Sequence, residues 1–288
     1  MKNYLIYVDA SVDIDLNFAK EKGLNFIPMN YTYDNVEGII RGDETDEELE
    51  QFYALIKAGK MPTTSQIAPF IYEELFTPLM EKGISILYIA LSSGLSSTYQ
   101  SALTASKTLK ENFPYCDLVV VDSLSAAASI GLLAETAIKN KENGLSIFDN
   151  ATDLEEFKKH IFVKAVVDDL NYLKRGGRVS ATTAFVGSIL GIKPMLLVND
   201  EGKLTVYDKK RGSKNAINAI IKDFEEQANL ETKLPIYVLH TLNQEMAEYT
   251  KTLIQDLCPH AKVIIKMISP IIGCHTGPGI VAVLCEAK

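Results

Sequence analysis

Short segments that are apolar at every position constrain the fold of this chain more than any other feature of its sequence. Residues 118–121 read Leu-Val-Val-Val, whereas a strand with one face in water alternates apolar and polar side chains. Uninterrupted apolar runs are typical of strands that are covered on both faces. The sequence contains eight strand-like segments, at residues 4–8, 84–91, 118–121, 162–167, 194–198, 236–240, 263–267 and 280–284.

Segments with helical periodicity lie between these strands. Their apolar residues recur at spacings of three and four, as on one face of a helix. Capping residues support the assignment, since Thr45 precedes an acidic first turn. Strands that alternate with helices predict an α/β protein with parallel or mixed sheets between helix layers. The six clearest helical segments are residues 46–57, 67–82, 97–112, 126–141, 213–227 and 244–257.

The length of the chain favours two domains. At about 150 residues per domain, 288 residues suffice for one large domain or two ordinary ones, and either can enclose a small ligand. The best boundary lies in residues 143–153, where one helix is expected to end and another to begin. We therefore expect an N-terminal α/β domain over residues 1–150 and a C-terminal α/β domain over residues 151–288.

The charge and the hydropathy pattern disfavour two classes of partner. The formal net charge is -8 and the sequence pI is about 5.2, so no general attraction to nucleic acid or anionic lipid is expected. The apolar stretches are far shorter than the roughly 18 to 20 residues that span a bilayer. The first three residues lead into a strand-like segment rather than a signal-peptide core. The sequence therefore predicts a cytoplasmic protein without a transmembrane segment.

Cysteine and histidine usage indicates neither a disulfide framework nor a metal site. The four cysteines include no CxxC pair, and Cys274 alone raises the possibility of a nucleophile, because it precedes His275. The other histidines, His160, His240 and His260, have no Cys, Asp or Glu at metal-ligand spacing. We expect no metal and no cofactor.

Two loops rich in hydroxyl groups precede helices. Residues 62–66 read Pro-Thr-Thr-Ser-Gln, and residues 91–100, directly after a predicted strand, read Leu-Ser-Ser-Gly-Leu-Ser-Ser-Thr-Tyr-Gln. Ligands of open α/β sheets bind beyond the carboxyl ends of strands, where helix N-termini favour anions. These hydroxyls either cap helices or bind a carboxylate or phosphate group. Neither GxxxxGK[ST] nor GxGxxG is present, so a nucleotide-binding fold is not indicated.

Two further loops combine glycines with basic residues. Residues 173–180, ahead of another expected helix, read Leu-Lys-Arg-Gly-Gly-Arg-Val-Ser, where an arginine could orient an anion. Residues 272–279 place His275 among three glycines, in what we expect to be a loop between apolar strands. The acidic residues that follow strands, Asp122, Asp168 and Asp169, are interpreted as turn carboxylates. Asp168 and Asp169 are not expected to act as an acid/base pair, because neighbours on a strand point to opposite faces.

Taken in order, the four loops resemble those of the DegV family, which includes the fatty-acid-binding subunits of bacterial fatty acid kinase. The resemblance covers essentially the whole chain and includes Asp9 and the pair Lys193-Pro194. It departs from the family pattern where the usual LSG reads Leu-Ser-Ser and the usual early DST reads Asp-Ala-Ser. The matching motifs are TTSQ at 63–66, LSSGLSSTYQSA at 91–102, KRGGRVS at 174–180 and HTGPG at 275–279.

The resemblance implies two α/β domains with a lipid tunnel between them. One long-chain fatty acid would lie in the tunnel, its carboxylate bonded to Thr64 and Ser96, with His275 completing the polar network. Arg178 and Arg211 would lie near the mouth or contact a kinase. The implied role is a non-catalytic subunit that presents the carboxylate to an ATP-dependent kinase, which forms acyl phosphate for phospholipid synthesis. The expected ligand-binding set is Thr63, Thr64, Ser93, Ser96, Arg178, Arg211 and His275.

Two other functions remain open at this point. A hydrolase would use Ser96 or Cys274 as nucleophile and His275 as base, although the sequence lacks a GxSxG elbow. A lipid-sensing protein without a kinase partner would share every site residue with the kinase subunit.

Overall fold

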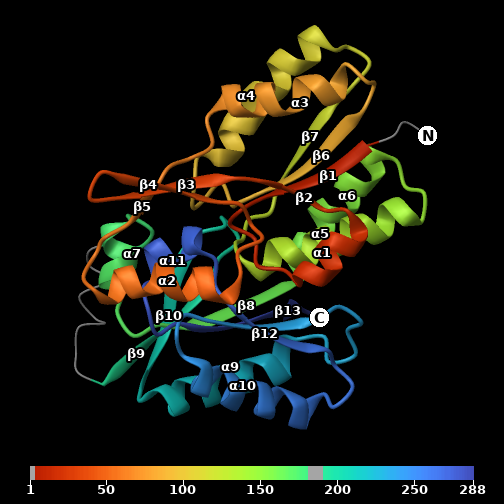
Figure 1. Ribbon diagram of the computed structural model, residues 1–288. Coiled ribbons are helices and arrows are strands. Elements are labelled where there is room, and N and C mark those ends of the chain that lie inside the picture. The colour runs from red at the N-terminus through yellow and green to blue at the C-terminus, as the bar shows by residue number, and fades with distance from the viewer. Residues whose placement is uncertain (1–3, 181–190) are drawn as a thin grey trace.

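The computed structural model describes residues 4–180 and 191–288, and two sheets dominate it (Figure 1). The first sheet is parallel throughout, with strand order β2-β1-β6-β7. Its strands are β1 (Tyr4–Asp9), β2 (Asn25–Ile27), β6 (Ser85–Ala90) and β7 (Leu118–Asp122). Helices cover both faces, which explains the continuous apolar runs. These are α1 (Leu16–Lys22), α3 (Pro69–Met80), α4 (Thr98–Asn112), α5 (Ala128–Glu142) and α6 (Ile147–Phe157).

The two faces of this sheet pack into separate cores. On β1, Ile6 and Val8 pack with α1, α5 and α6, whereas Tyr7 between them packs with α3 and α4. The same alternation continues on β6, where Leu87 belongs to the first core and Tyr88 to the second. Successive side chains of a strand point to opposite faces of the sheet, so helices pack on both faces. The result is three layers, with the sheet between two layers of helices.

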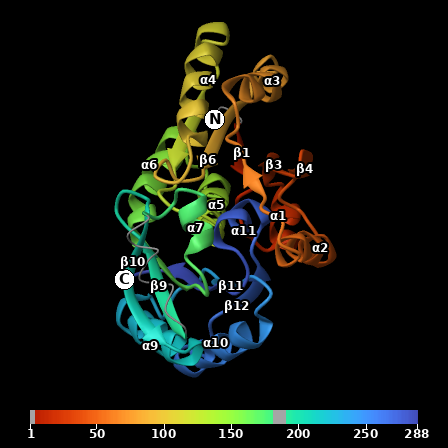
Figure 2. The same cartoon turned by 90° about the vertical axis from the view of Figure 1, so that its left-hand side faces the viewer.

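The second sheet is mixed, with strand order β10-β9-β8-β13-β11-β12. Only the β11–β12 pair in it is parallel. Its strands are β8 (Ile161–Val166), β9 (Ile192–Val198), β10 (Leu204–Arg211), β11 (Ile236–His240), β12 (Val263–Met267) and β13 (Val281–Glu286). Helices α9 (Ser213–Gln227) and α10 (Gln244–Leu257) cover its outer face, and its inner face turns toward α5 (Figure 2).

A third, smaller unit lies beside the junction of the two sheets. It contains an antiparallel sheet of β3 (Met29–Tyr33), β4 (Val36–Ile40) and β5 (Thr63–Thr64). Helix α2 (Asp46–Lys57) packs against α11 (Pro270–Thr276), which in turn contacts α7 (Asn171–Arg175). A short 3-10 helix, η1 (Lys158–His160), connects α6 to β8.

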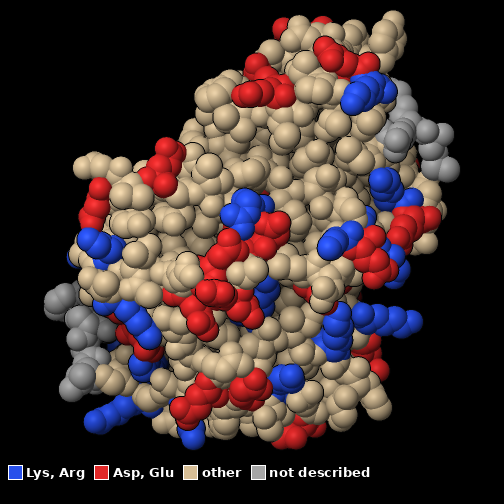
Figure 3. Space-filling model, in the orientation of Figure 1, with Lys and Arg blue, Asp and Glu red and all other residues tan. Residues whose placement is uncertain are grey.

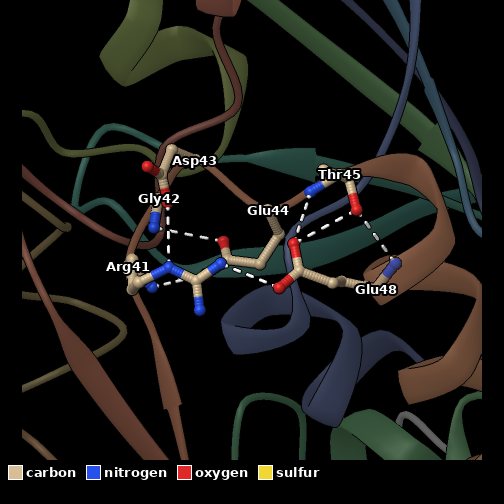
Figure 4. Close-up of polar contacts among 6 residues, drawn as sticks. All are labelled: Arg41, Gly42, Asp43, Glu44, Thr45 and Glu48. Carbon is tan, nitrogen blue, oxygen red and sulfur yellow. Dashed lines mark hydrogen bonds and ion pairs between the residues drawn. The ribbon is translucent and has the colours of Figure 1, made fainter.

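Helix α2 begins with two reciprocal hydrogen bonds. The Glu48 amide donates to Thr45 Oγ1 at 3.3 Å, and the Thr45 amide donates to the Glu48 carboxylate at 2.8 Å (Figure 4). Arg41 adds bonds to Glu48 at 2.9 Å and to Asp43 at 3.1 Å. This capping box satisfies amides that the helix itself cannot pair.

The α/β class, the eight strands and the six helices expected from the sequence are all confirmed, with ends shifted by at most two or three residues. One local expectation was wrong, since His275 lies in the last turn of α11 rather than in a loop. Pro270 occupies the first turn of this helix, where its missing amide costs nothing, and the glycine-rich segment begins only at its end. The helix expected after Ser180, and residues 1–3, lie outside the described residues.

The division into two domains at residue 150 stays a prediction. Residue 150 lies inside α6, and Asn150 is fully buried there, its amide donating to the Tyr4 hydroxyl at 2.9 Å and to the Ala137 carbonyl at 2.8 Å. Helix α6 therefore packs with the four-stranded sheet.

Basic and acidic side chains are interspersed on the face drawn in Figure 3, without large separate areas of one sign. Among the described residues, no helix has the length and apolar character needed to cross a membrane.

Candidate functional site

Three polar loops meet where the parallel strands β1, β6 and β7 end, and two buried carboxylates hold them. Asp9 accepts hydrogen bonds from the Tyr88 hydroxyl at 2.7 Å and from the Leu91 amide at 2.8 Å. Asp122 accepts from the amides of Ser93 at 3.1 Å and Leu124 at 3.0 Å. The loop after β6 is therefore fixed from both neighbouring strands, at the sheet edge where α/β proteins bind ligands.

Ser96 lies in this loop, half-buried at the start of α4. Its Oγ is 2.9 Å from Thr98 Oγ1 and accepts from the Thr98 amide at 3.2 Å. The hydroxyl thus closes a short turn just ahead of α4, and the residue lines the cavity described below.

His275 joins α11 to β5. Its Nε2 is 2.8 Å from Thr64 Oγ1, whereas its buried Nδ1 has no hydrogen-bond partner among the described residues. The ring rests on Gly176, where a Cβ atom would lie only 2.3 Å from Nδ1. Burial, together with the positive charges of Arg178 and Arg175, lowers the pKa of His275 to about 4. The imidazole is therefore neutral at physiological pH.

Arg178 connects the loop after α7 to the loop after β6. Its Nε donates to the Leu95 carbonyl at 3.0 Å, and its Nη1 donates to the carbonyl of Gly176. Burial lowers the pKa of the guanidinium, which nevertheless remains protonated at neutral pH. Arg178 therefore supplies a fixed positive charge beside the imidazole.

A cavity, partly open to solvent, extends from these polar groups along the inner face of the second sheet, and its other walls come from the loops after β6 and β7 and from α11. Of the 24 residues that line it, 18 are apolar, which indicates a ligand with a long hydrocarbon part. The polar six are Thr64, Ser96, Ser125, Arg178, His275 and Thr276. Much of the apolar wall comes from β8, β9 and β13, through Val163, Ala165, Leu196, Val198, Ala282 and Leu284.

The structure brings together four of the seven residues expected to bind ligand, namely Thr64, Ser96, Arg178 and His275. It places the other three, Thr63, Ser93 and Arg211, on the exposed surface, outside the lining. Thr63 faces away from Thr64 because neighbouring residues on a strand point to opposite faces, and its hydroxyl lies 3.3 Å from that of Thr32.

Two serines at the site did not emerge from the sequence analysis as site residues. Ser92 is buried, and its hydroxyl donates to the Gly202 carbonyl at 2.8 Å, which ties the loop after β6 to the β9–β10 turn. Ser125 lines the cavity just after β7. Their position in the sequence could have indicated them, because both serines come just after strands of the parallel sheet, where ligands of α/β proteins bind.

The turn carboxylates behave as expected. Asp168 forms an ion pair with Lys193 at 2.6 Å, and Asp169 accepts from the Asn171 amide at 2.8 Å. In the described ranges, no group of three His, Cys, Asp or Glu side chains could hold a metal ion.

The geometry does not favour a hydrolase. His275 Nε2 is bonded to Thr64, and Ser96 is bonded to Thr98, so no Ser96–His275 bond is formed. No carboxylate within the described residues orients the ring, whose Nδ1 is unpaired. Burial raises the pKa of the Cys274 thiol to about 12, which keeps it protonated and unreactive.

Comparison with known proteins identifies relatives along nearly the whole chain. A family model described as "Uncharacterised protein, DegV family" matches residues 3–288. A DegV domain-containing protein of Clostridium perfringens is 37% identical over 285 residues, 98% of this chain and 97% of that protein. A Thermotoga maritima protein named fatty acid-binding protein is 34% identical over 96% of this chain and 95% of its own length. The crystal structure of a DegV lipid binding protein from T. maritima superposes with a TM-score of 0.86 at 29% identity, covering 99% of this chain and 98% of the other. The chain therefore belongs to the DegV family.

Proposed function

We propose that this protein binds one long-chain fatty acid, with the acyl chain in the cavity and the carboxylate at Thr64, Ser96 and His275. The observation that best supports this function is the composition of the lining, which is apolar except at a few positions. Four of the polar residues, Thr64, Ser96, Arg178 and His275, are also those of the motifs on which the family resemblance rests.

The polar groups suit a carboxylate that has left water. A buried carboxylate needs several hydrogen-bond donors, or it takes up a proton instead. The hydroxyls of Thr64 and Ser96 can turn to donate. Arg178 adds a positive charge, and it forms no ion pair with another side chain among the described residues. A bound carboxylate would in turn favour the protonated form of His275 and raise its pKa.

The apolar wall accounts for affinity. An acyl chain with about 14 methylenes gains roughly 0.8 kcal/mol for each one that is buried, on the order of 11 kcal/mol before the costs of ordering and association. Slow release follows from such a large apolar term. The names of two relatives, a fatty acid-binding protein and a DegV lipid binding protein, support the same assignment.

Titration of the delipidated protein with stearic acid and with its methyl ester tests this proposal. The acid should bind with one-to-one stoichiometry and the ester at least about tenfold more weakly, because an ester cannot accept charge-assisted hydrogen bonds. Equal affinity for both would contradict the assignment of a carboxylate site, and binding of neither would contradict the proposed function.

We further propose that the bound acid is presented to a separate ATP-dependent kinase, as the family resemblance implies. A carboxylate oxygen would attack the γ-phosphorus of ATP, forming acyl phosphate and releasing ADP. The acyl phosphate would then be used for phospholipid synthesis. The sequence contains no phosphate-binding GxxxxGK[ST] loop with which this chain could bind ATP itself. The exposed Arg211 at the end of β10 is a candidate for contact with the kinase.

The kinase proposal is tested by mixing the loaded protein with a purified bacterial fatty acid kinase subunit and ATP. Acyl phosphate should form, and Arg211→Gln should slow its formation without changing fatty acid affinity. Fatty acid binding without any acyl phosphate would instead favour a lipid-sensing protein that has no kinase partner.

A further inference from the structure

One hydroxyl on the cavity wall is buried and unpaired. Ser125 is only 5% exposed and lines the cavity, yet its Oγ has no hydrogen-bond partner among the described residues. A buried hydroxyl without a partner costs free energy, so such a group points to something that pairs with it in the working protein.

The other polar groups on the wall do not pair with Ser125. Ser96 is bonded to Thr98, Thr64 to His275, and Arg178 to the carbonyl of Leu95. The fifth, Thr276, donates its hydroxyl to the carbonyl of Ile272 at 3.3 Å. Ser125 is thus not hydrogen-bonded to any of the groups that are proposed to hold the carboxylate.

The backbone holds Ser125 firmly in place. Its carbonyl accepts from the Ser92 amide and from the Ser123 hydroxyl, both at 3.0 Å, and its amide donates to Ser123 Oγ at 3.2 Å. The residues on either side of this segment, Leu124 and Ala127, have φ of 47° and 57°, which non-glycine residues rarely adopt. These backbone conformations cost free energy, and such costs are typical of segments that have a functional role.

Ser125 supplies the polar side-chain atom of this stretch of the wall, because the next two residues, Ala126 and Ala127, have no polar side-chain atoms. Helix α5 begins at Ala128 without a side-chain cap, so its positive end adds a preference for an acceptor oxygen at this place.

We propose that Ser125 is a second polar contact for the ligand, which selects fatty acids with a hydroxyl or oxo oxygen along the acyl chain over unsubstituted acids of the same length. This inference rests on the proposed fatty acid function and specifies its ligand class. A hydroxyl on the acyl chain can donate to or accept from Ser125, whereas a methylene leaves the serine unpaired.

The test is competitive binding between stearic acid and a series of hydroxystearic acids that differ in the position of the hydroxyl. In the wild-type protein, at least one isomer should bind about three- to tenfold more tightly than stearic acid. Ser125→Ala should abolish this ratio. Ser129→Ala is a matched control, because Ser129 also has a buried unpaired hydroxyl but lies outside the cavity lining, and it should keep the ratio.

Two results would overturn the inference, and they differ from each other. If stearic acid binds but no isomer is preferred, or if the preference survives in Ser125→Ala, Ser125 does not select the ligand while the proposed function stands. If no acid of either kind binds, the proposed function fails together with the inference.

Discussion

The hydroxyl oxygen of Thr64 lies 2.8 Å from Nε2 of His275, although 211 positions separate the two residues in the sequence. This contact joins β5, from the small antiparallel sheet, to α11, which connects β12 and β13 of the second sheet. The polar end of the cavity therefore forms only when segments from both ends of the chain have packed together.

Replacing this hydroxyl should weaken ligand binding. Thr64→Val keeps the shape of the side chain but removes its hydrogen bond to His275 and to a bound carboxylate, so affinity for stearic acid should fall about tenfold. Thr63→Val is the matched control, because Thr63 is exposed on the opposite face of the same two-residue strand. Equilibrium titration of both variants checks the prediction, and equal losses in the two would contradict it.

The contact between Gly176 and His275 leads to a second prediction. Gly176→Ala introduces a Cβ atom 2.3 Å from Nδ1 of His275, so the ring must shift and its hydrogen bond to Thr64 is disturbed. We expect a loss of about 1 to 3 kcal/mol in the free energy of unfolding, together with weaker fatty acid binding. Chemical denaturation and titration measure the two effects.

A double-mutant cycle separates this clash from other effects of the alanine. In a protein that already contains His275→Ala, the side chain that Gly176→Ala would strike is absent, and the same substitution should then cost far less. Strictly additive losses in the free energy of unfolding would show that the two residues do not interact.

Asp13 should make stability depend on pH in a defined direction. Burial raises the pKa of Asp13 to about 7, although the charge of Lys266 and the amide of Ser269 act to lower it. Between about pH 4 and pH 7 the folded protein therefore holds a proton that the unfolded chain releases, and stability falls as pH rises. The contribution of this group is about 1.4 kcal/mol per pH unit.

Asp13→Asn tests this linkage. The free energy of unfolding of the variant minus that of the wild type should increase with pH between about 4 and 7, and then level off. The pKa of His275, lowered to about 4, gives an opposite slope between about pH 4 and 6.5, but it cancels in this difference. A flat difference for Asp13→Asn would refute the linkage.

The parallel sheet and its helices could be predicted because their signals are local. The apolar run at residues 118–121 and the periodicity of residues 46–57 each determine one element, and the structure has β7 and α2 there. Strand β5 has only two residues and exists through its pairing with β3, so no local pattern indicates it. The same is true of α11, whose Gly273 packs directly against Tyr53 of α2.

The candidate site was predictable to a similar degree. Thr64, Ser96, Arg178 and His275 belong to motifs and lie together, whereas the exposure of Thr63 depends on the direction in which a two-residue strand faces. The apolar wall could not be predicted, because side chains such as Ala165 and Ala282 come from ordinary strand sequences. Their role follows from the packing of the inner face of the second sheet opposite α11 and the loops after β6 and β7.

Native mass spectrometry of the freshly purified protein, followed by extraction of anything bound, tests the central proposal most directly. A long-chain fatty acid should be present at one molecule per chain, and it should be released when the protein is denatured. An empty protein that also takes up neither added palmitate nor added oleate would contradict the proposal that the cavity binds a fatty acid.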